Sequence, residues 1–382
     1  MSTASFLKEE HMIFRRAVRS FLEKEIKPHY EKWEKDGLIP RDIWYKLGKE
    51  GLLCPWLPEE YGGMGADFGY SFVLIEELER IGSSLVGVPL HNDVVVPYLW
   101  HYGNKEQKKR WLPKCATGES VTAVAMTEPG TGSDLQAIKT TAILDGDSYV
   151  LNGSKTFISN GLHGDLFVVV CKTDPKAEPA RAGISLLVVD GNSEGFIKGK
   201  KLNKVGLRSQ DTLELTFEDV RVPKENLLGE AGKGFYYLME QLQQERLIVA
   251  IAAVTAAEVT LDSTLTYVKE RKAFGKPVGS FQHNQFTLVE LATKGEIGRT
   301  FLHSLVERHM RGEAVVKEVS MAKWWLTDLA KETVSTCVQL HGGYGYMEEY
   351  EVARRSRDIP VSAIYAGTNE IMKTIIAKKM GL

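Results

Sequence analysis

The chain has 382 residues, which is long enough for two or three domains. Hydrophobic residues make up 43% of it and charged residues 26%, and 48 basic against 50 acidic residues leave a net charge of −2. This composition is typical of a globular protein. The even mixture of charges excludes a basic arm for nucleic acid and a polybasic membrane-binding segment. We expect no membrane span, because no apolar run reaches the necessary length.

The four cysteines, Cys54, Cys115, Cys171 and Cys337, are scattered and form no CxxC pair. Scattered thiols favour a reducing compartment, and the N-terminal sequence has no signal-peptide core, so a cytoplasmic location is expected. The nine histidines show no metal-ligand spacing, and we therefore predict no metal site.

The first domain, residues 1–119, is predicted to be helical. Helices are expected at 6–21, 43–47 and 70–81, where apolar residues recur at helical spacing. The first of them is expected to end at Pro28. The glycine-rich stretch 61–69 follows no clear strand and is interpreted as a turn. The apolar stretch 85–96 is equally consistent with core packing and with the wall of a cavity.

Composition changes at Glu119, and residues 120–230 are predicted to form a β domain. Strands are expected at 121–127, 166–171, 184–189 and 212–217. Turn signals stand at 145–146 and at 152–153, with a short strand between them. The domain closes at Pro223 and Gly229.

The last domain, residues 231–382, is predicted to be a bundle of antiparallel helices, because long periodic segments are joined by short links. These helices are expected at 234–271, 282–311, 314–340 and 369–379. The whole chain is therefore predicted to be α+β, with helices, then strands, then helices.

A carboxylate interrupts the apolar stripe of the first long helix. Apolar residues recur from Phe235 to Ala256, and Glu245 stands on the same face, with Arg246 at its edge. Burial would raise the pKa of Glu245, so that it could exchange a proton near neutral pH. Taken alone, this segment favours the simpler interpretation that both residues mark the solvated end of the stripe.

The string AMTEPGTGSD at 125–134 carries the most specific signal, and its two glycines let the backbone approach a ligand closely. It resembles the signature of the acyl-CoA dehydrogenase family, which contacts the flavin ring and the substrate. Further matches follow in the expected order: KTFISNG at 155–161, FEDVRVPKENLLG at 217–229, RKAFG at 271–275, QLHGG at 339–343 and YAGTNE at 365–370. The resemblance covers essentially the whole chain. It implies an N-terminal helical domain, a β-barrel-like middle domain and a C-terminal four-helix bundle.

The resemblance implies one FAD per chain. Residues 157–159 match the strand beside the isoalloxazine ring, 271–275 match the positions that hold the diphosphate and adenine, and 339–343 match a segment that reaches the FAD of a neighbouring subunit. A homotetramer, built as a dimer of dimers, follows from that last match. The implied FAD contacts are Val124, Met126, Thr127, Gly132, Ser133, Phe157, Ile158, Ser159, Arg271, Phe274, Phe281, Gln282, Gln339, Leu340, His341, Gly342, Gly343, Thr368 and Glu370.

Many members of this family carry the catalytic glutamate in the YxGT loop, where this chain has Ala366. A second group, which includes the long-chain and isovaleryl-CoA dehydrogenases, carries it on the helix after the β domain, in a string like Gln244-Glu245-Arg246. The resemblance therefore implies that Glu245 removes the α-proton of an acyl-CoA thioester while flavin N5 accepts the β-hydride, which gives a trans-2-enoyl-CoA. The implied substrate contacts are Ser133, Tyr236, Gln243, Arg246, Tyr365, Ala366 and Gly367.

The substrate class is left open by the sequence. Several strings look most like the long-chain subgroup, and the bulky Tyr365 favours straight chains of medium to long length, as in fatty acid β-oxidation. A short branched-chain enzyme of the isovaleryl type is an alternative. So are an acyl-CoA oxidase, a dehydrogenase of carrier-protein thioesters and a non-enzymatic flavin-binding relative. The electron acceptor that the resemblance implies is an electron-transferring flavoprotein.

Overall fold

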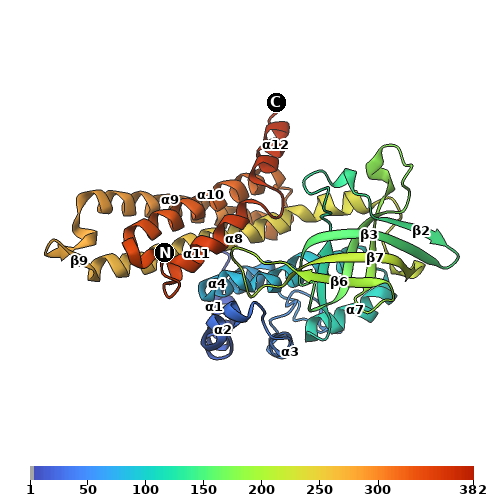
Figure 1. Ribbon diagram of the computed structural model, residues 1–382, viewed down its shortest axis with the longest axis horizontal. Coiled ribbons are helices and arrows are strands. Elements are labelled where there is room, and N and C mark those ends of the chain that lie inside the picture. Colours follow the sequence, from blue (N-terminus) through green and yellow to red (C-terminus); the bar gives the residue numbers. More distant parts are fainter. Residues whose placement is uncertain (1–3) are drawn as a thin grey trace.

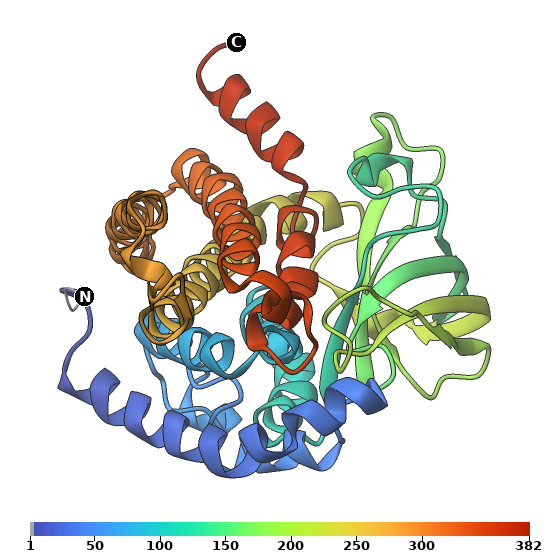
Figure 2. The ribbon, with the colours of Figure 1, turned by 60° about the vertical axis from the view of Figure 1, so that its left-hand side comes forward.

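The computed structural model describes residues 4–382 and confirms the predicted α+β class, with helical first and last thirds and a sheet-rich middle. The sheet lies at one end of the molecule, and the helices of both helical regions pack together beside it (Figure 1). A view from another side shows the same separation of sheet and helices (Figure 2). One buried apolar cluster joins residues from all three regions, among them Phe72, Val168 and Leu247.

The N-terminal helices are more numerous than predicted. They are α1 (Glu9–Phe21), α2 (Tyr30–Asp36), α3 (Asp42–Lys49), α4 (Phe68–Ile81), α5 (Gly87–Pro89), α6 (Val96–Tyr102) and α7 (Lys105–Thr117). The expected helix end at Pro28 is wrong. A π-helical turn (Leu22–Ile26) and a 3-10 turn (Lys27–His29) carry the chain into α2, and Pro28 stands at the start of that 3-10 turn, where a missing N–H breaks no bond. Residues 85–96 are helical and mostly buried, so they belong to the core.

The middle region folds into an 8-stranded sheet with the order β6-β7-β3-β2-β4-β5-β8, in which β1 pairs with β4 in parallel. The strands are β1 (Val121–Ala125), β2 (Thr141–Asp145), β3 (Ser148–Ser159), β4 (Gly164–Lys172), β5 (Ile184–Asp190), β6 (Phe196–Lys201), β7 (Thr212–Pro223) and β8 (Leu227–Leu228). The turn predicted at 152–153 is wrong, because both residues lie inside β3, beside a bulge at Gly153. The side chain of Asn152 bonds Asp219 across the sheet instead.

Long helices build the C-terminal region and follow the predicted segments closely. They are α8 (Gly234–Glu270), α9 (Gln282–Met310), α10 (Val316–His341), α11 (Glu351–Asp358) and α12 (Asn369–Lys379). The helix α11 was not predicted. A small hairpin, β9 (Lys272–Ala273) and β10 (Lys276–Pro277), joins α8 to α9. Figure 1 shows α8 running from the sheet to this hairpin at the opposite end of the molecule.

Among the described residues, α8 is long and apolar enough to cross a membrane by length and composition alone, with a mean hydropathy of 1.6 in an 18-residue window. This differs from the expectation that no apolar run reaches that length. In the folded chain 72% of the window is buried inside the protein. The apolar residues of α8 are thus covered by protein, as in the core helix of a bundle.

Candidate functional site

Glu245 and Arg246 are buried near the sheet end of α8, with exposed fractions of 6% and 4%. The interpretation of these residues as a solvated helix end is therefore wrong. Burial raises the pKa of Glu245 to about 7, against the opposing effects of a hydrogen bond from Tyr98 and the charge of Arg246. A carboxyl group with this pKa can take up and release a proton at neutral pH.

Tyr98 is a site residue that the sequence analysis did not identify. Its hydroxyl group, on α6, donates a 2.6 Å hydrogen bond to Glu245 Oε1 and is itself buried. The neighbouring Gln244 donates through Nε2 to the carbonyl of Asp93 at 2.8 Å. These two bonds fix this part of α8 against the segment that precedes α7. The two residues of the Tyr98–Glu245 pair are 147 positions apart, so no spacing pattern links them.

The YAGT loop connects a 3-10 turn (Ile359–Ala363) to α12 and has an unusual backbone. Ala366 and Gly367 are both left-handed, with φ values of 53° and 88°. Among the residues that the structure describes, none accepts a hydrogen bond from the Ala366 N–H. Tyr365 and Ala366 pack against the same apolar cluster that contains Leu247 of α8. The 3-10 turn that leads into this loop contacts α8, the helix that carries Glu245.

A buried lysine on α10, Lys323, bonds the YAGT loop and is close enough to Arg246 to feel its charge. Lys323 Nζ donates to the carbonyl of Gly367 at 2.8 Å. Burial, and after it the charge of Arg246, lowers the pKa of Lys323 to about 8. The guanidinium of Arg246 has an Nε atom without a hydrogen-bond partner among the described residues. This buried donor can bond a ligand group, although several other arginine Nε atoms among the described residues are also without a partner.

The strings at 125–134 and 155–161 are tied together at the edge of the sheet. Lys155 Nζ, fully buried, donates to the carbonyl of Met126 at 2.9 Å and to Glu128 Oε1 at 3.0 Å. The N–H of Thr156 donates to the carbonyl of Thr127 at 2.9 Å. The turn after β1 is thus held against β3 by a salt bridge and by backbone bonds.

This edge of the sheet fits a flat aromatic ring. The side chain of Phe157 is 67% exposed and its backbone is left-handed, with φ of 60°. A Cβ atom added at Gly130 would meet nothing within 4 Å, so the turn leaves open space beside it. Exposed aromatic surface in a strained backbone is characteristic of a binding site. Ile158 differs, because its side chain is buried in the sheet core and leaves only its backbone for a ligand.

A second group of predicted FAD contacts gathers at the other end of α8. The ring of Tyr267 stacks on His341 at 4.2 Å and its hydroxyl donates to the His341 carbonyl. The guanidinium of Arg271 lies 5.2 Å from the centre of the Tyr344 ring. Phe274 is 94% exposed. Segments 271–282 and 339–343 are therefore neighbours in space.

The two groups of predicted FAD contacts do not meet within one chain. Arg271 follows Glu245 by 26 positions, along a helix that runs to Glu270. At 1.5 Å of rise per residue, the separation along the axis is about 39 Å. In Figure 1 the hairpin with β9 and the sheet accordingly lie at opposite ends. Thr368 ends the YAGT loop and caps α12, and Glu370 lies in the first turn of that helix.

Among the described residues, no hydrogen bond joins the other predicted substrate contacts Gln243, Tyr236 and Ser133 to Glu245. The side-chain amide of Gln243 bonds the carbonyl of Glu313 and the N–H of Val315, so it fastens the α9–α10 link. Tyr236, in the first turn of α8, is 42% exposed. Ser133 is exposed in the turn after β1.

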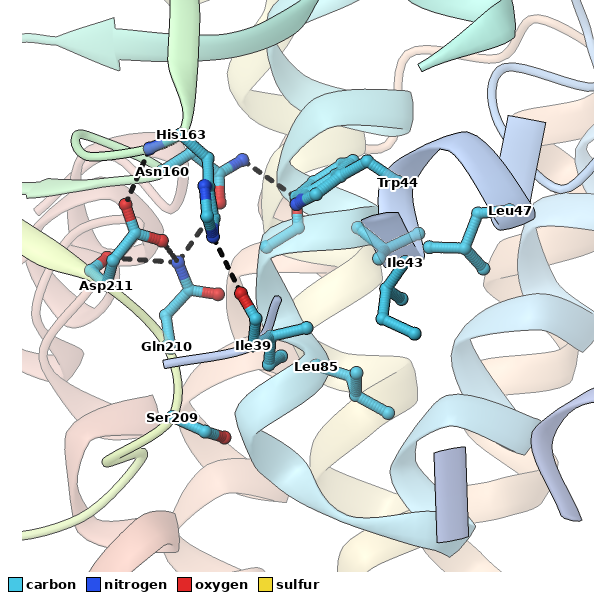
Figure 3. Close-up of a pocket in the computed structure, with 12 residues that line it drawn as sticks. Ile39, Ile43, Trp44, Leu47, Leu85, Asn160, His163, Ser209, Gln210 and Asp211 are labelled. Atoms are coloured by element: carbon cyan, nitrogen blue, oxygen red, sulfur yellow. Dashed lines mark hydrogen bonds between the residues drawn. The ribbon is translucent and has the colours of Figure 1, made fainter. Parts of the chain in front are cut away.

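A small cavity of about 10 Å³ lies between the sheet and the N-terminal helices, lined by apolar residues and by Asn160, Gln210 and Asp211 (Figure 3). It has room for about one water molecule and not for a cofactor. Its polar side chains are bonded to each other and to the helices: Asn160 Nδ2 donates to the Gly87 carbonyl, and Gln210 Nε2 to Asn160 Oδ1. This network fixes the end of β3, and with it Phe157, against the helices.

No group of three His, Cys, Asp or Glu side chains in residues 4–382 is arranged to hold a metal ion. The four cysteines are buried and unpaired with one another.

Comparison with known proteins identifies the family. The model of the acyl-CoA dehydrogenase N-terminal domain matches residues 8–119, that of the middle domain matches 123–220, and that of the C-terminal domain matches 232–381. A crystal structure of an acyl-CoA dehydrogenase from Geobacillus kaustophilus is 64% identical over 100% of both chains, with a TM-score of 0.99. The mitochondrial long-chain specific acyl-CoA dehydrogenase of Sus scrofa is 47% identical over 97% of this chain and 86% of its own length.

Two further relatives bear on the cofactor and the substrate. A glutaryl-CoA dehydrogenase from Mycobacterium smegmatis, solved in complex with FADH2, is 27% identical over 98% of this chain and 95% of its own, with a TM-score of 0.91. The short/branched chain specific acyl-CoA dehydrogenase of Bos taurus is 36% identical over 97% of this chain and 85% of its own length. The chain therefore belongs to the acyl-CoA dehydrogenase family of FAD-dependent oxidoreductases.

Proposed function

We propose that this protein dehydrogenates a straight-chain acyl-CoA of medium to long length to the trans-2-enoyl-CoA, with Glu245 as the base that removes the α-proton. The observation that carries the proposal is the pair of positions 245 and 366. The carboxyl group at 245 is buried and its pKa is raised to about 7, whereas position 366 holds an alanine that has no proton acceptor.

The residues of the chain have distinct parts in this reaction. Glu245 takes the α-proton, and Tyr98 stabilises its charged form through the 2.6 Å hydrogen bond. The free N–H of Ala366 donates to the thioester carbonyl and stabilises the negative charge that develops there. The unpaired Nε of Arg246 is available for the CoA pantetheine. Bound FAD supplies the acceptor for the hydride that leaves the β-carbon.

The preference for straight chains rests on Tyr365 and on the relatives. Tyr365 packs against the core beside Ala366, where its ring takes space that a branch near the α-carbon would need. The identity of 47% to a long-chain enzyme exceeds the 36% to a short/branched chain enzyme. A branched substrate is the alternative, and reduction of the flavin by paired straight and branched acyl-CoAs separates the two.

We further propose that each FAD site is completed by two chains of a homotetramer built as a dimer of dimers. Two observations support this: about 39 Å of α8 lies between Glu245 and Arg271, and the sheet with the first group of contacts lies at the opposite end of the molecule from the hairpin with the second (Figure 1). An electron-transferring flavoprotein in the cytoplasm is the proposed electron acceptor. The predicted domain bounds, 1–119, 120–230 and 231–382, remain part of this proposal.

The test is Glu245→Gln, which keeps the shape of the side chain and removes its basicity. Flavin reduction by a straight-chain acyl-CoA in a single turnover should slow by about 10²–10⁴-fold, while FAD and acyl-CoA still bind. Glu240→Gln is the matched control, since Glu240 lies on the same helix, is exposed and bonds Tyr102. A Glu245→Gln enzyme that reduces its flavin at the wild-type rate would show that Glu245 is not the base.

A further inference from the structure

Lys323 lies in the middle of α10 with 0% of its surface exposed. Burying an ammonium group is costly unless it is well paired, and a lysine without a specific partner is rarely found in a core. The hydrogen-bond partners of Lys323 among the described residues are the carbonyl of Gly367 at 2.8 Å and Asn369 Oδ1 at 3.1 Å. Neither partner is a carboxylate, so ion pairing does not account for the lysine.

The carbonyl that Lys323 holds belongs to a strained turn. Ala366 is left-handed, with φ of 53°, although alanine has no side-chain polar atom to favour that conformation. A non-glycine residue stays in this region only where its surroundings impose it. Gly367, the next residue, is also left-handed, with φ of 88°, and its carbonyl is the atom that accepts from Lys323.

The far side of the turn is fixed to the same helix. Asn369 Nδ2 donates to the carbonyl of Trp324 at 3.2 Å and to Asp328 Oδ1 at 3.0 Å, both on α10. On the near side, Tyr365 and Ala366 pack on the apolar core. Between these anchors the Gly367 carbonyl is held by Lys323, which also bonds Asn369, so the loss of Lys323 frees the turn that directs the Ala366 N–H.

We propose that Lys323 is a positioning residue: its ammonium group fixes the turn at Ala366 and Gly367 and so holds the Ala366 N–H in place for the thioester carbonyl. This inference rests on the proposed function, which assigns that N–H to the carbonyl oxygen. Lys323 acts through the backbone and does not touch the substrate.

The test compares Lys323→Met with Thr327→Val and Lys198→Met. Methionine keeps the length of the side chain but has no N–H. Thr327 bonds Asn369 in the same cluster, so Thr327→Val perturbs the packing there and leaves the bond to Gly367. Lys198, in β6, donates at 2.7 Å to the carbonyl of Gly164 and controls for the loss of a lysine–carbonyl bond that is not part of the YAGT loop.

Two quantities are measured. The first is the rate of flavin reduction in a single turnover, which should fall by about 10-fold or more in Lys323→Met, because a displaced donor stabilises the transition state less. The dissociation constant of the acyl-CoA should change by less than about 3-fold, since the same donor adds little in the ground state. Lys198→Met should keep the wild-type rate, and Thr327→Val, which loosens Asn369 but leaves the bond to Gly367, should lose less of the rate than Lys323→Met.

The second quantity is the infrared stretching frequency of the thioester carbonyl, labelled with ¹³C and bound to enzymes that carry Glu245→Gln so that the substrate does not react. A hydrogen bond lowers this frequency, and adding Lys323→Met should return it toward the value of free acyl-CoA. If Lys323→Met leaves both the rate and the frequency at their parent values, the inference is overturned while the proposed function stands. If the parent shows no lowered frequency at all, the assignment of the Ala366 N–H itself fails.

If Lys323→Met does not retain FAD, Lys323→Gln takes its place, because the glutamine amide donates a hydrogen bond without a charge. An intermediate frequency in that variant supports the inference, and an unchanged frequency with an unchanged rate contradicts it.

Discussion

Burial of Glu245 is opposed by the hydrogen bond from Tyr98 and by the charge of Arg246, and a change in any of these should move the pH dependence of the reaction. Burial raises the pKa of Glu245 to about 7, and the hydrogen bond from Tyr98 lowers it. Flavin reduction should therefore rise as the pH increases through about 7, because the base acts in its unprotonated form. The same raised pKa stabilises the folded protein at low pH, and this contribution is lost as the pH rises through about 7.

Tyr98→Phe should shift this profile to higher pH. A hydrogen bond to a charged group contributes about 1.5–3 kcal/mol, which corresponds to about one to two pKa units when it favours only the charged form. The rate at pH 7 should fall and then recover in alkaline buffer. Tyr102→Phe is the control, since Tyr102 bonds the exposed Glu240 on the same helix pair. A Tyr98→Phe profile that matches the wild-type profile would show that this bond does not tune the base.

The role of a single residue could be predicted where the residue type did not fit its sequence pattern. A carboxylate on an apolar stripe at 245 and an alanine at 366 explain each other once the family resemblance is considered. Tyr98, Lys323 and Asn369 offered no such signal, because a buried polar residue in an apolar helix looks like any other polar residue until its partner is known. Their partners lie 147, 44 and 46 positions away or belong to the backbone.

At the scale of elements, the catalytic carboxylate should be transferable between the helix and the loop. In Glu245→Gln with Ala366→Glu, a carboxylate returns on the loop that packs against the same core. Alanine and glutamate share the conformational cost of the left-handed position at 366, so the turn should persist. Single-turnover flavin reduction should recover by about 10-fold over Glu245→Gln, and only partially, because the new carboxylate lacks supporting contacts. A double variant as slow as Glu245→Gln would argue against this transfer.

A buried ion cluster joins three helices of the two helical regions. Arg299 on α9 bonds Glu258 on α8 at 2.7 Å and Glu76 on α4 at 2.6 Å. Arg299→Met should lower the free energy of unfolding by about 3–5 kcal/mol, because it leaves the buried Glu258 without an ionic partner and Glu76 with Arg15 alone. Lys294→Met, which removes an exposed pair with Glu332, should cost less than about 1 kcal/mol. Denaturant unfolding of both variants at saturating FAD measures the difference, and equal losses would refute the role of the cluster.

Helices with a long stretch of periodic apolar residues were predicted well, whereas the turn predicted from the local sequence at 152–153 was wrong. The four predicted C-terminal helices differ from α8, α9, α10 and α12 by at most two residues at each end. Gly153 was misread as part of a turn, although its actual role is a close approach: an added Cβ would lie 2.6 Å from Thr140 Oγ1. Tertiary packing decides such a case, and the neighbouring sequence alone does not show which strand will lie alongside.

At the scale of the whole molecule, the motifs predicted the cofactor, and the resemblance also predicted that residues 339–343 reach the FAD of a neighbouring subunit. The motif at 125–134 follows a strand of the sheet, whereas the motif at 271–275 lies in the hairpin at the opposite end of the molecule (Figure 1). The length of α8 was predictable from the length of the sequence over which its apolar pattern repeats. The positions of both ends of α8 in space support the proposal that two chains complete each site.

A mixture of two defective chains tests the shared site. One variant loses the contacts at the hairpin end, as in Arg271→Ala with Gln339→Ala, and the other loses the ring contacts, as in Phe157→Ala with Thr127→Ala. Each homodimer then has two incomplete sites. Under two-fold symmetry a mixed dimer has one site with both halves intact and one with neither.

After dissociation and random reassociation, half of the dimers are mixed, so FAD binding and flavin reduction by acyl-CoA should recover to about a quarter of the wild-type level. A mixture of the two variants that is not allowed to dissociate and reassociate shows the effect of simple addition, and it should stay inactive. Each variant alone is a further control. A mixture that stays as inactive as its components, in spite of demonstrated chain exchange, would mean that each chain binds its FAD alone.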